Sequence, residues 1–237
     1  MSAFAIFGGS GGVGSALARR LNDAGHEVFL IGRNRETLER LASELSCRFA
    51  VADVTDAAAI GDAVAEAPES LAGVAYAVGT IDLKPLRRVE EDDLRRAFEL
   101  NVVGAVSALK AAREKMADDA SAVLFSSIAA QQGFQNHTAV AAAKGAVEAL
   151  TRQLAAEWAP RVRVNAVALS LVETPLAGEI LKSDAMKDGI AKSHPLQRIG
   201  APDDAAAMAA FLLSPDSGWA TGGVFNLDGG RSSLARS

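Results

Sequence analysis

A serine and a lysine form the pair of residues most suited to chemistry in this sequence. Ser127 closes an apolar run, and Lys144 follows 17 residues later on a stretch with helical spacing. A hydroxyl and an ammonium in this layout suit an active site that moves a hydride and a proton together. Val140 stands four residues before the lysine, and its side chain can donate no proton.

The lysine belongs to a predicted helix that runs from about Thr138 to Trp158 and ends before Pro160. One face of this helix is largely apolar. The residues that recur on that face at steps of three or four are Val140, Lys144, Val147, Thr151 and Leu154. An ammonium among apolar neighbours needs a partner or a cavity, so we expect Lys144 to reach one of the two.

A glycine-rich loop follows the first predicted strand, Phe4–Phe7, and opens a predicted helix over Ser15–Asn22. Glycines let the backbone turn tightly and approach a pyrophosphate, which then meets the helix N-terminus. The loop residues expected to hold a dinucleotide are Gly8, Ser10, Gly11, Gly12, Val13 and Gly14. The alternative is a tight strand-to-helix turn that binds no ligand.

The end of the second predicted strand carries a basic residue where a nucleotide-binding protein selects its cofactor. Gly32, Arg33 and Asn34 follow the run Val28–Ile31, roughly twenty residues after the glycine loop. An acidic side chain there would bind the ribose hydroxyls of NAD(H), whereas an arginine suits the 2′-phosphate of NADP(H). We therefore expect Arg33 and Asn34 to bind NADP(H) in preference to NAD(H). The alternative for Arg33 is a solvated charge at a helix entry.

Short apolar runs alternate with longer stretches of helical spacing, which predicts a parallel sheet covered by helices on both faces. The predicted strands are Phe4–Phe7, Val28–Ile31, Phe49–Val51, Val74–Val78, Val123–Phe125, Val162–Val167 and Val224–Leu227. The acidic cluster Glu90–Asp93 favours the start of another helix. Its expected apolar stripe consists of Leu94, Phe98, Val102, Val106 and Leu109.

The composition argues against several classes of protein. The net charge is -5, with 24 basic and 29 acidic residues and no basic block, so nucleic acid is not an expected partner. The single cysteine, Cys47, can form no internal disulfide, lacks a partner for a metal site and suits a reducing compartment. Neither a signal peptide nor an apolar run of roughly 18 residues is evident, so we expect a cytoplasmic protein that makes no membrane contact.

Together, the glycine loop, Arg33, Asn101, Ser127 and Lys144 resemble the short-chain dehydrogenase/reductase family, and the resemblance covers nearly the whole chain. The closing segments that also match are Trp219–Gly223 and Leu227–Gly230. The resemblance implies a single Rossmann-like α/β domain over residues 1–237, with a doubly wound parallel sheet and its site at the carboxyl ends of the strands. It also implies a homodimer or homotetramer, with the alanine-rich helix around Lys144 at an interface.

The resemblance implies a role for each matching residue. Those expected at the cofactor, beyond the glycine loop and Arg33, are Asp53, Val54, Gly79, Lys144, Val172 and Thr174. In the family, the lysine holds the nicotinamide ribose and lowers the pKa of a phenol, the serine steadies the carbonyl oxygen, and the helix asparagine, here Asn101, positions a water. Alternatively, Ser127 only caps the backbone at the end of its strand, and Asn101 only forms hydrogen bonds with helix or strand backbone.

The stretch from about Glu173 to Pro202 has weak periodicity and is rich in proline and glycine. By resemblance it is the substrate lid, and otherwise it is an ordinary surface excursion. The residues that suggest an apolar wall there are Leu171, Leu176, Ile180 and Met186.

Three departures from the family pattern put its chemistry in doubt. Tyr76-Ala77-Val78-Gly79 replaces an Asn-Asn-Ala-Gly turn, Leu169-Ser170 replaces a Pro-Gly pair, and Val140 replaces the catalytic tyrosine. Tyr76 is the only tyrosine, and it belongs to another strand. A protein without the phenol still has the residues to bind cofactor, and it would turn over more slowly because general acid catalysis contributes about 10²–10⁴-fold.

Histidine 137 is the candidate replacement for the phenol, because it precedes Val140 by three residues and imidazole is a competent acid near neutral pH. The alternative is a loop histidine in an interface or in solvent. His26 and His194 are weaker candidates for the proton donor.

We predict an NADP(H)-dependent oxidoreductase acting on a small carbonyl or alcohol substrate, with the proton supplied by water, His137 or the substrate. The alternatives are an NADP(H)-binding sensor or partner subunit, and an isomerase or dehydratase on the same fold.

Overall fold

A computed structural model of the chain describes residues 2–234, in which seven parallel strands form one sheet. The strands lie in the order β3-β2-β1-β4-β5-β6-β7. Their bounds are β1 Ala3–Phe7, β2 Glu27–Gly32, β3 Arg48–Val51, β4 Leu71–Tyr76, β5 Met116–Ser127, β6 Val162–Leu169 and β7 Val224–Leu227. The predicted strands are all present, and tertiary pairing extends β5 and β6 beyond their apolar runs.

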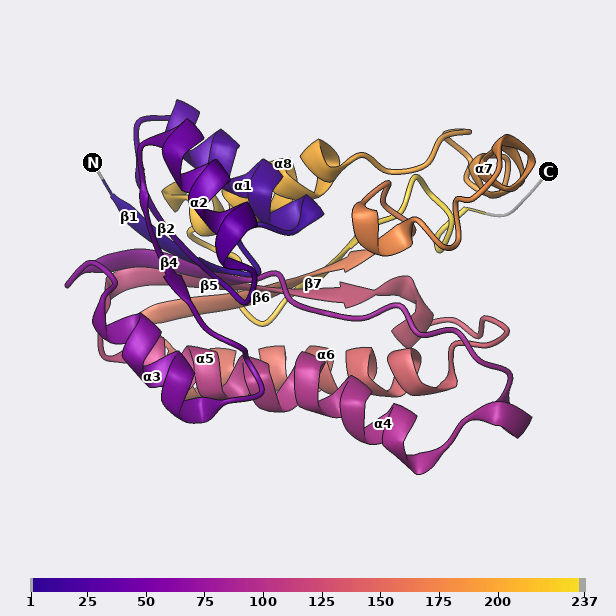
Figure 1. The fold of residues 1–237 in the computed structure, drawn as a ribbon, viewed down its shortest axis with the longest axis horizontal. Coiled ribbons are helices and arrows are strands. Elements are labelled where there is room, and N and C mark those ends of the chain that lie inside the picture. Colours follow the sequence, from indigo (N-terminus) through magenta and orange to yellow (C-terminus); the bar gives the residue numbers. More distant parts are fainter. Residues whose placement is uncertain (1, 235–237) are drawn as a thin grey trace.

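Helices cover both faces of the sheet because its central strands are apolar on both sides (Figure 1). The helices over one face are α1 Gly12–Asp23, α2 Arg35–Leu45 and α8 Pro202–Leu213. Those over the other face are α3 Ala57–Ala65, α5 Gly104–Arg113 and α6 Thr138–Trp158. The doubly wound Rossmann-like fold predicted from the sequence is therefore confirmed.

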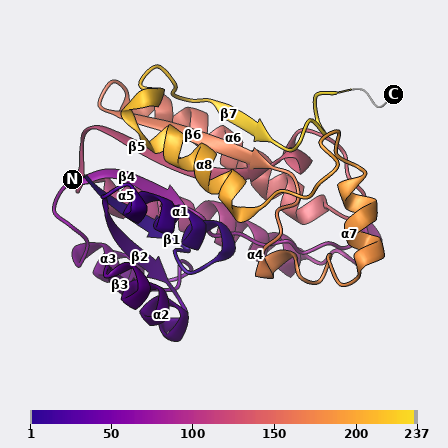
Figure 2. The ribbon, with the colours of Figure 1, turned by 90° about the horizontal axis from the view of Figure 1, so that it is seen from above.

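The strand order reverses between β1 and β4. Because the strands are parallel, the segments that follow β1, β4 and β5 all start from the carboxyl ends of the sheet. The glycine loop leaves β1, Ala77–Gly79 leaves β4, and Ser127 closes β5. In open parallel sheets, ligands bind in the crevice outside the carboxyl ends of the strands at such a reversal. Helix α7, Asp184–Ala191, lies beyond the same edge (Figure 2).

The excursion predicted over Glu173–Pro202 contains a short 3₁₀ turn, Pro175–Ala177, and helix α7. No residue of α7 is buried, and Ser183 caps its first turn by accepting the Met186 amide at 3.3 Å. This helix spans only 8 residues and contains Gly189, so its apolar period is too short for the sequence pattern to indicate a helix. Within residues 2–234, no helix is long and apolar enough to span a bilayer.

The helix expected after Glu90–Asp93 consists of three parts: α4 Glu91–Phe98, a π-helical turn Glu99–Val103, and α5. Of the apolar stripe expected along it, Leu94, Val102 and Leu109 do pack against buried residues, but Phe98 and Val106 are 37% and 41% exposed, so the prediction was wrong at these two positions. A π turn inserts one residue into the α-helical register and rotates the faces that follow.

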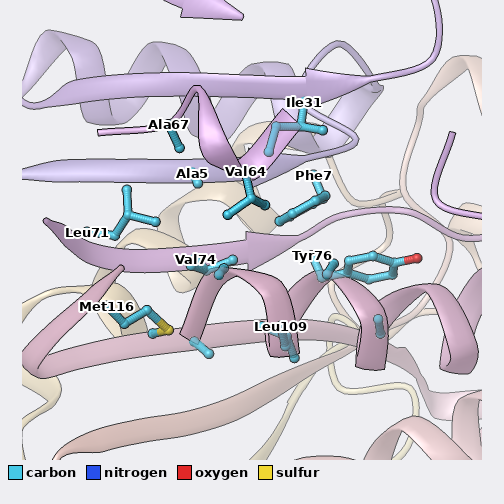
Figure 3. Packing of buried hydrophobic residues seen from close by; sticks show 14 of the residues in the cluster. Ala5, Phe7, Ile31, Val64, Ala67, Leu71, Val74, Tyr76, Leu109 and Met116 are labelled. Carbon is cyan, nitrogen blue, oxygen red and sulfur yellow. The ribbon is translucent and has the colours of Figure 1, made fainter. Parts of the chain in front are cut away.

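Tyr76 supports this π turn from the neighbouring strand. Its ring lies in the apolar core beside Phe7 and Leu109 (Figure 3), and its hydroxyl donates to the Leu100 carbonyl at 2.6 Å. Burial raises the pKa of Tyr76 above its ordinary range, and the nearby charges of Asp53 and Glu99 add to the rise. This phenol is therefore a structural donor whose partner is a backbone carbonyl.

Tyr76→Phe is expected to lower the free energy of unfolding by about 1–3 kcal/mol, because the Leu100 carbonyl loses its buried donor. Urea unfolding followed by circular dichroism measures the change. An unaltered midpoint and slope would show that solvent satisfies the carbonyl instead.

Candidate active site

The glycine loop turns between β1 and α1 with contacts that exclude side chains. Gly8 has φ +75°, and a Cβ on it would lie 2.7 Å from the Ala77 carbonyl oxygen. A Cβ on Gly14 would collide with the carbonyl oxygen of Gly8. Helix α1 begins at Gly12 and no side chain caps it, so its first-turn amides are open to an anion.

Thr174 brings the start of the excursion against this loop. A Cβ on Gly12 would lie 2.5 Å from the Thr174 methyl carbon, so only glycine allows the approach. Val172 forms an isolated bridge with Gly200, which holds the excursion's two ends together. The structure therefore places Val13, Val172 and Thr174 together along one cavity wall.

The Lys144 ammonium is buried beside the end of β5. Its Nζ donates to the Phe125 carbonyl at 2.8 Å, which uses one of three donors. Burial lowers the Lys144 pKa from 10.5 to about 8. The sequence expectation that this lysine would find a partner or a cavity is confirmed on both counts, since Lys144 also lines the main cavity.

Asn101 and Lys144 converge on Gly79. The position of a Cβ on Gly79 lies 3.0 Å from both Asn101 Oδ1 and Lys144 Nζ, so a side chain there would fill the space between them. Asn101 Nδ2 donates to the Ala97 carbonyl at 2.8 Å, whereas its buried Oδ1 has no partner among the described residues. An orphaned acceptor beside an ammonium suits a bound water.

The two neighbouring serines point to different partners. Ser126 donates to Glu148 Oε1 at 3.0 Å and lies in the interior. Ser127 accepts the Ala129 amide at 3.2 Å and also lines the main cavity. A hydroxyl can accept one bond and donate another, so the observed capping leaves the Ser127 proton available to a ligand.

The main cavity, of about 350 Å³, opens between the strand ends and the excursion. Among its lining residues are Ser127, Val140, Lys144, Leu171, Leu176 and Arg231. Val140 is 5% exposed and presents only methyl groups. Ile180 also lines the cavity, but Met186 does not and is exposed, so the expected apolar wall omits Met186.

A separate hollow of about 370 Å³ lies near the ends of β2 and β3, and we call it the arginine hollow. Its lining includes Arg33, Asp53, Thr55, Arg96 and Glu99. Arg33 makes no hydrogen bond or ion pair within residues 2–234. Asp53 accepts the Thr55 amide and hydroxyl, and that amide hydrogen bond is the main cause of its lowered pKa.

Other residues expected at the cofactor have structural partners. The Asn34 side chain caps α2 by accepting the Thr37 amide at 3.0 Å. Ser10 accepts the Thr37 hydroxyl at 3.0 Å. Val54 is buried beside the start of α5, where a Cβ on Gly104 would lie 2.9 Å from its carbonyl oxygen.

His137 lies one residue before α6 begins, so it is not on the helix face of Val140. Its Nδ1 lies 2.7 Å from the Gln135 carbonyl and its ring contacts Phe134, yet it lines the main cavity. The condition that the helix had begun by His137 was wrong.

Two residues on the cavity wall, Ser170 and Arg231, were not predicted from the sequence as site residues. Ser170 lies 2.7 Å from the buried His194, and Arg231 Nη1 lies 3.5 Å from the same Ser170 oxygen. The sequence did contain one indication of Ser170, because a serine stands there in place of the glycine of the family pattern. The partner of Ser170 lies 24 residues away and could be found only in the folded chain.

These residues fit a nicotinamide dinucleotide. The glycine loop and first turn of α1 suit a pyrophosphate, while Lys144 retains two donors for ribose hydroxyls. Two further features border the proposed cofactor site. The unpartnered Asn101 Oδ1 lies beside the space at Gly79, and the Thr174 methyl group contacts Gly12.

A family model described as enoyl-(acyl carrier protein) reductase matches residues 8–232. The chain is 35% identical to 2-(S)-hydroxypropyl-CoM dehydrogenase 3 of Xanthobacter autotrophicus over 97% of this chain and 96% of the relative. It is 36% identical to the inactive 2-(S)-hydroxypropyl-CoM dehydrogenase 2 of the same organism, over 92% and 100%. A short-chain type dehydrogenase/reductase from Mycobacterium ulcerans superposes with a TM-score of 0.92, at 32% identity and covering 98% and 90% of the two chains.

Lys144→Met is expected to stabilise the protein at pH 7. Because the folded state lowers the Lys144 pKa to about 8, the unfolded chain holds the proton more tightly, which costs about 3 kcal/mol below pH 8. Loss of the bond to Phe125 offsets about 1 kcal/mol. The net gain is therefore roughly 1–3 kcal/mol, and it shrinks as pH rises from 8 toward 10.5, where native stability recovers.

Urea unfolding at several pH values measures this difference. Lys110→Met, at an exposed position of α5, is the matched control and should show no such pH-dependent gain. A Lys144→Met protein that is less stable than native at pH 7 would contradict the desolvation argument.

Proposed function

The chain belongs to the short-chain dehydrogenase/reductase family, as its motifs predicted, and we propose that it is an NADP(H)-dependent oxidoreductase of a small carbonyl or alcohol substrate with an atypical proton donor. Its relatives are oxidoreductases, so the class of activity follows from the family. The observation that carries the proposal is the convergence of Lys144 and Asn101 on Gly79, beside a cavity that Ser127 lines.

The preference for NADP(H) rests on the arginine hollow. Arg33 stands at the end of β2 and makes no ion pair within residues 2–234, so its guanidinium can bind a 2′-phosphate. Arg96 lies in the same hollow and adds a second positive charge. A carboxylate that would bind ribose hydroxyls is absent from positions 32–34.

At the other end of the cofactor, three side chains take separate tasks. Lys144 would hold the ribose hydroxyls of a bound cofactor with its two remaining donors, and Asn101 Oδ1 would accept a hydrogen bond from a water that also contacts the ammonium. Ser127 donates to the carbonyl oxygen while it continues to accept the Ala129 amide. The bound nicotinamide supplies or accepts the hydride.

Two further assignments belong to this proposal. The excursion over 173–202 is the substrate lid, because Leu176 and Ile180 close the cavity from that side. The protein forms a homodimer or homotetramer through the α5–α6 face. Val103 and Val106 are 47% and 41% exposed there, and Ala142 and Ala149 are exposed on α6.

A second candidate function is NADP(H) binding without turnover. Val140 favours it, because no proton donor stands where the family has its phenol. The relative named as inactive shows only that the family includes a protein described in that way. Native turnover of any carbonyl would exclude this candidate.

Arg33→Ala is expected to weaken NADPH binding about 10- to 100-fold and to leave NADH binding within about twofold, because one charged contact to the 2′-phosphate is lost. Isothermal titration with each nucleotide measures both affinities. Arg40→Ala, at an exposed position of α2, is the matched control. Equal losses for both nucleotides would contradict the assignment of Arg33.

Val140→Tyr is expected to raise kcat by up to about 10²-fold over Val140→Phe, which adds the same ring without a hydroxyl, because the phenol gives the reacting oxygen an acid in addition to the native donor. The assay follows NADPH and NADH oxidation with acetophenone, cyclohexanone and ethyl acetoacetate, and NADP⁺ reduction with 1-phenylethanol. Native turnover of one probe supports the proposed oxidoreductase. Equal rates for the tyrosine and phenylalanine variants would contradict the expected gain and would show that a phenol at position 140 adds nothing to the native proton supply.

A further inference from the structure

Ser170 stands at the carboxyl end of β6, next to the strand that ends with Ser127. Leu169 pairs with Ser127 in the parallel register, and Ser170 is the next residue. Its amide donates to the Leu227 carbonyl, which ties the backbone to β7. Ser170 lines the main cavity together with Val140 and Lys144, so a hydroxyl is present on a wall of the cavity that lacks the phenol.

His194 approaches Ser170 from the excursion. Its Nε2 lies 2.7 Å from Ser170 Oγ, and its Nδ1 lies 2.8 Å from the Ile190 carbonyl. A carbonyl can only accept, so Nδ1 carries a proton in every state of the ring. In the neutral ring, Nε2 accepts from the Ser170 hydroxyl. In the imidazolium, Nε2–H donates to the same oxygen.

The imidazole is 3% exposed, yet it is not sealed from solvent. A smaller cavity of about 80 Å³, the rear cavity, lies behind it and is lined by Ser170, His194, Arg198, Asp204 and Asp228. Arg198 and Asp204 form an ion pair with side chains 54% and 32% exposed, so this cavity reaches toward the surface. Ser170 lines both cavities and stands between them.

The charges around the imidazole are mixed. Asp228, Asp204 and Arg198 face the ring across the rear cavity, and Arg231 Nη1 lies 3.5 Å from Ser170 Oγ on the main-cavity side. Ser193 Oγ lies 3.4 Å from Nδ1. Both signs of charge are therefore within the surroundings of the ring, and either protonation state has an electrostatic partner.

We propose that Ser170 and His194 form a proton relay that replaces the missing phenol, an inference that rests on the proposed oxidoreductase function. Ser170 would be the catalytic residue, since it lines the main cavity and its hydroxyl would donate to the reacting oxygen of a substrate bound there. His194 acts through Ser170 and stores the proton. The relay uses a wall of the main cavity that in the family pattern carries a glycine, which has no side chain to donate.

In the reducing direction, one hydride and two protons move. The carbonyl carbon gains a hydride from the reduced nicotinamide, and the C=O π pair moves to oxygen. That oxygen takes the Ser170 proton, while Ser170 Oγ takes the Nε2 proton of the imidazolium. The substrate is reduced to an alcohol, the nicotinamide is oxidised, and neutral His194 regains a proton from solvent through the rear cavity.

The direction of the pH dependence follows from these steps. Reduction needs the imidazolium, so its rate falls as His194 loses its proton with rising pH. Oxidation of an alcohol needs the neutral ring, so its rate rises over the same interval. Lys144 also titrates, near pH 8, and therefore the step that belongs to His194 is the one that a His194 variant removes.

Nuclear magnetic resonance of the imidazole nitrogens in the full-length protein tests the pair without any turnover. Neutral His194 is expected as the Nδ1–H tautomer, and S170A should shift both its Nε2 resonance and its titration midpoint. His26 and His137 serve as internal references. An Nε2–H tautomer, or a His194 titration that S170A leaves unchanged, overturns the relay.

Kinetics with the carbonyl probe that the native protein reduces fastest tests the transfer itself. S170A is expected to lower kcat about 10²–10⁴-fold, with KM and NADPH affinity within about twofold. S170T, which keeps the hydroxyl, should recover most of the rate. H194Q can still bond both Ser170 and Ile190 but carries no titratable proton, so it should lower kcat and remove the His194 step from the pH profile.

Ser43→Ala is the matched control, because it deletes an exposed hydroxyl on α2 that lines neither cavity. Native-like kcat in S170A and H194Q overturns the relay and leaves the proposed function standing. Loss of rate in His137→Ala but not in H194Q also overturns it, in favour of His137. A native protein that binds NADPH and reduces no probe overturns the relay and the proposed function together.

Discussion

One buried ammonium is the constraint around which the site is arranged. Lys144 can lie inside the protein because the Phe125 carbonyl at the end of β5 accepts one of its protons. Burial still lowers its pKa to about 8, so the ion is held at a cost to stability that a purely structural lysine would not explain. The buried ammonium borders the space at Gly79 together with Asn101 Oδ1, and we propose that its two unused donors bind the cofactor there.

The position of Asn101 depends on a separate device. The π turn Glu99–Val103 interrupts the helix, and Tyr76 supports the turn by donating to the Leu100 carbonyl. The phenol that family enzymes keep at the substrate is thus absent there, and the only tyrosine of this chain serves the backbone beside the asparagine. In the function that we propose, cofactor binding and proton supply, which share one tyrosine–lysine pair in the family pattern, are separated.

This separation explains the contrast between the walls of the main cavity. Lys144 and Ser127 stand on the β5–α6 side, where Val140 contributes only methyl groups. Across the neighbouring strand, Ser170 and His194 place a hydroxyl and an imidazole in series between the main cavity and the rear cavity. The proton route that we infer therefore runs through β6 and the excursion, whereas most of the proposed cofactor contacts lie on α6 and on the segments that follow β1, β2 and β4.

Much of this could be read from the sequence, because it depends on neighbours in the chain. Burial on both faces makes the strands continuously apolar, and the 3.6-residue period places Val140 and Lys144 on one buried face. The glycine loop, the parallel sheet covered by helices on both faces and the absence of a phenol at position 140 were all predictable in this way. The tertiary structure alone decided the rotation at the π turn, the contact of Thr174 with Gly12 and the pairing of Ser170 with His194. These contacts join segments far apart in sequence, or depend on one inserted residue, and no local period records where an excursion folds back onto the sheet.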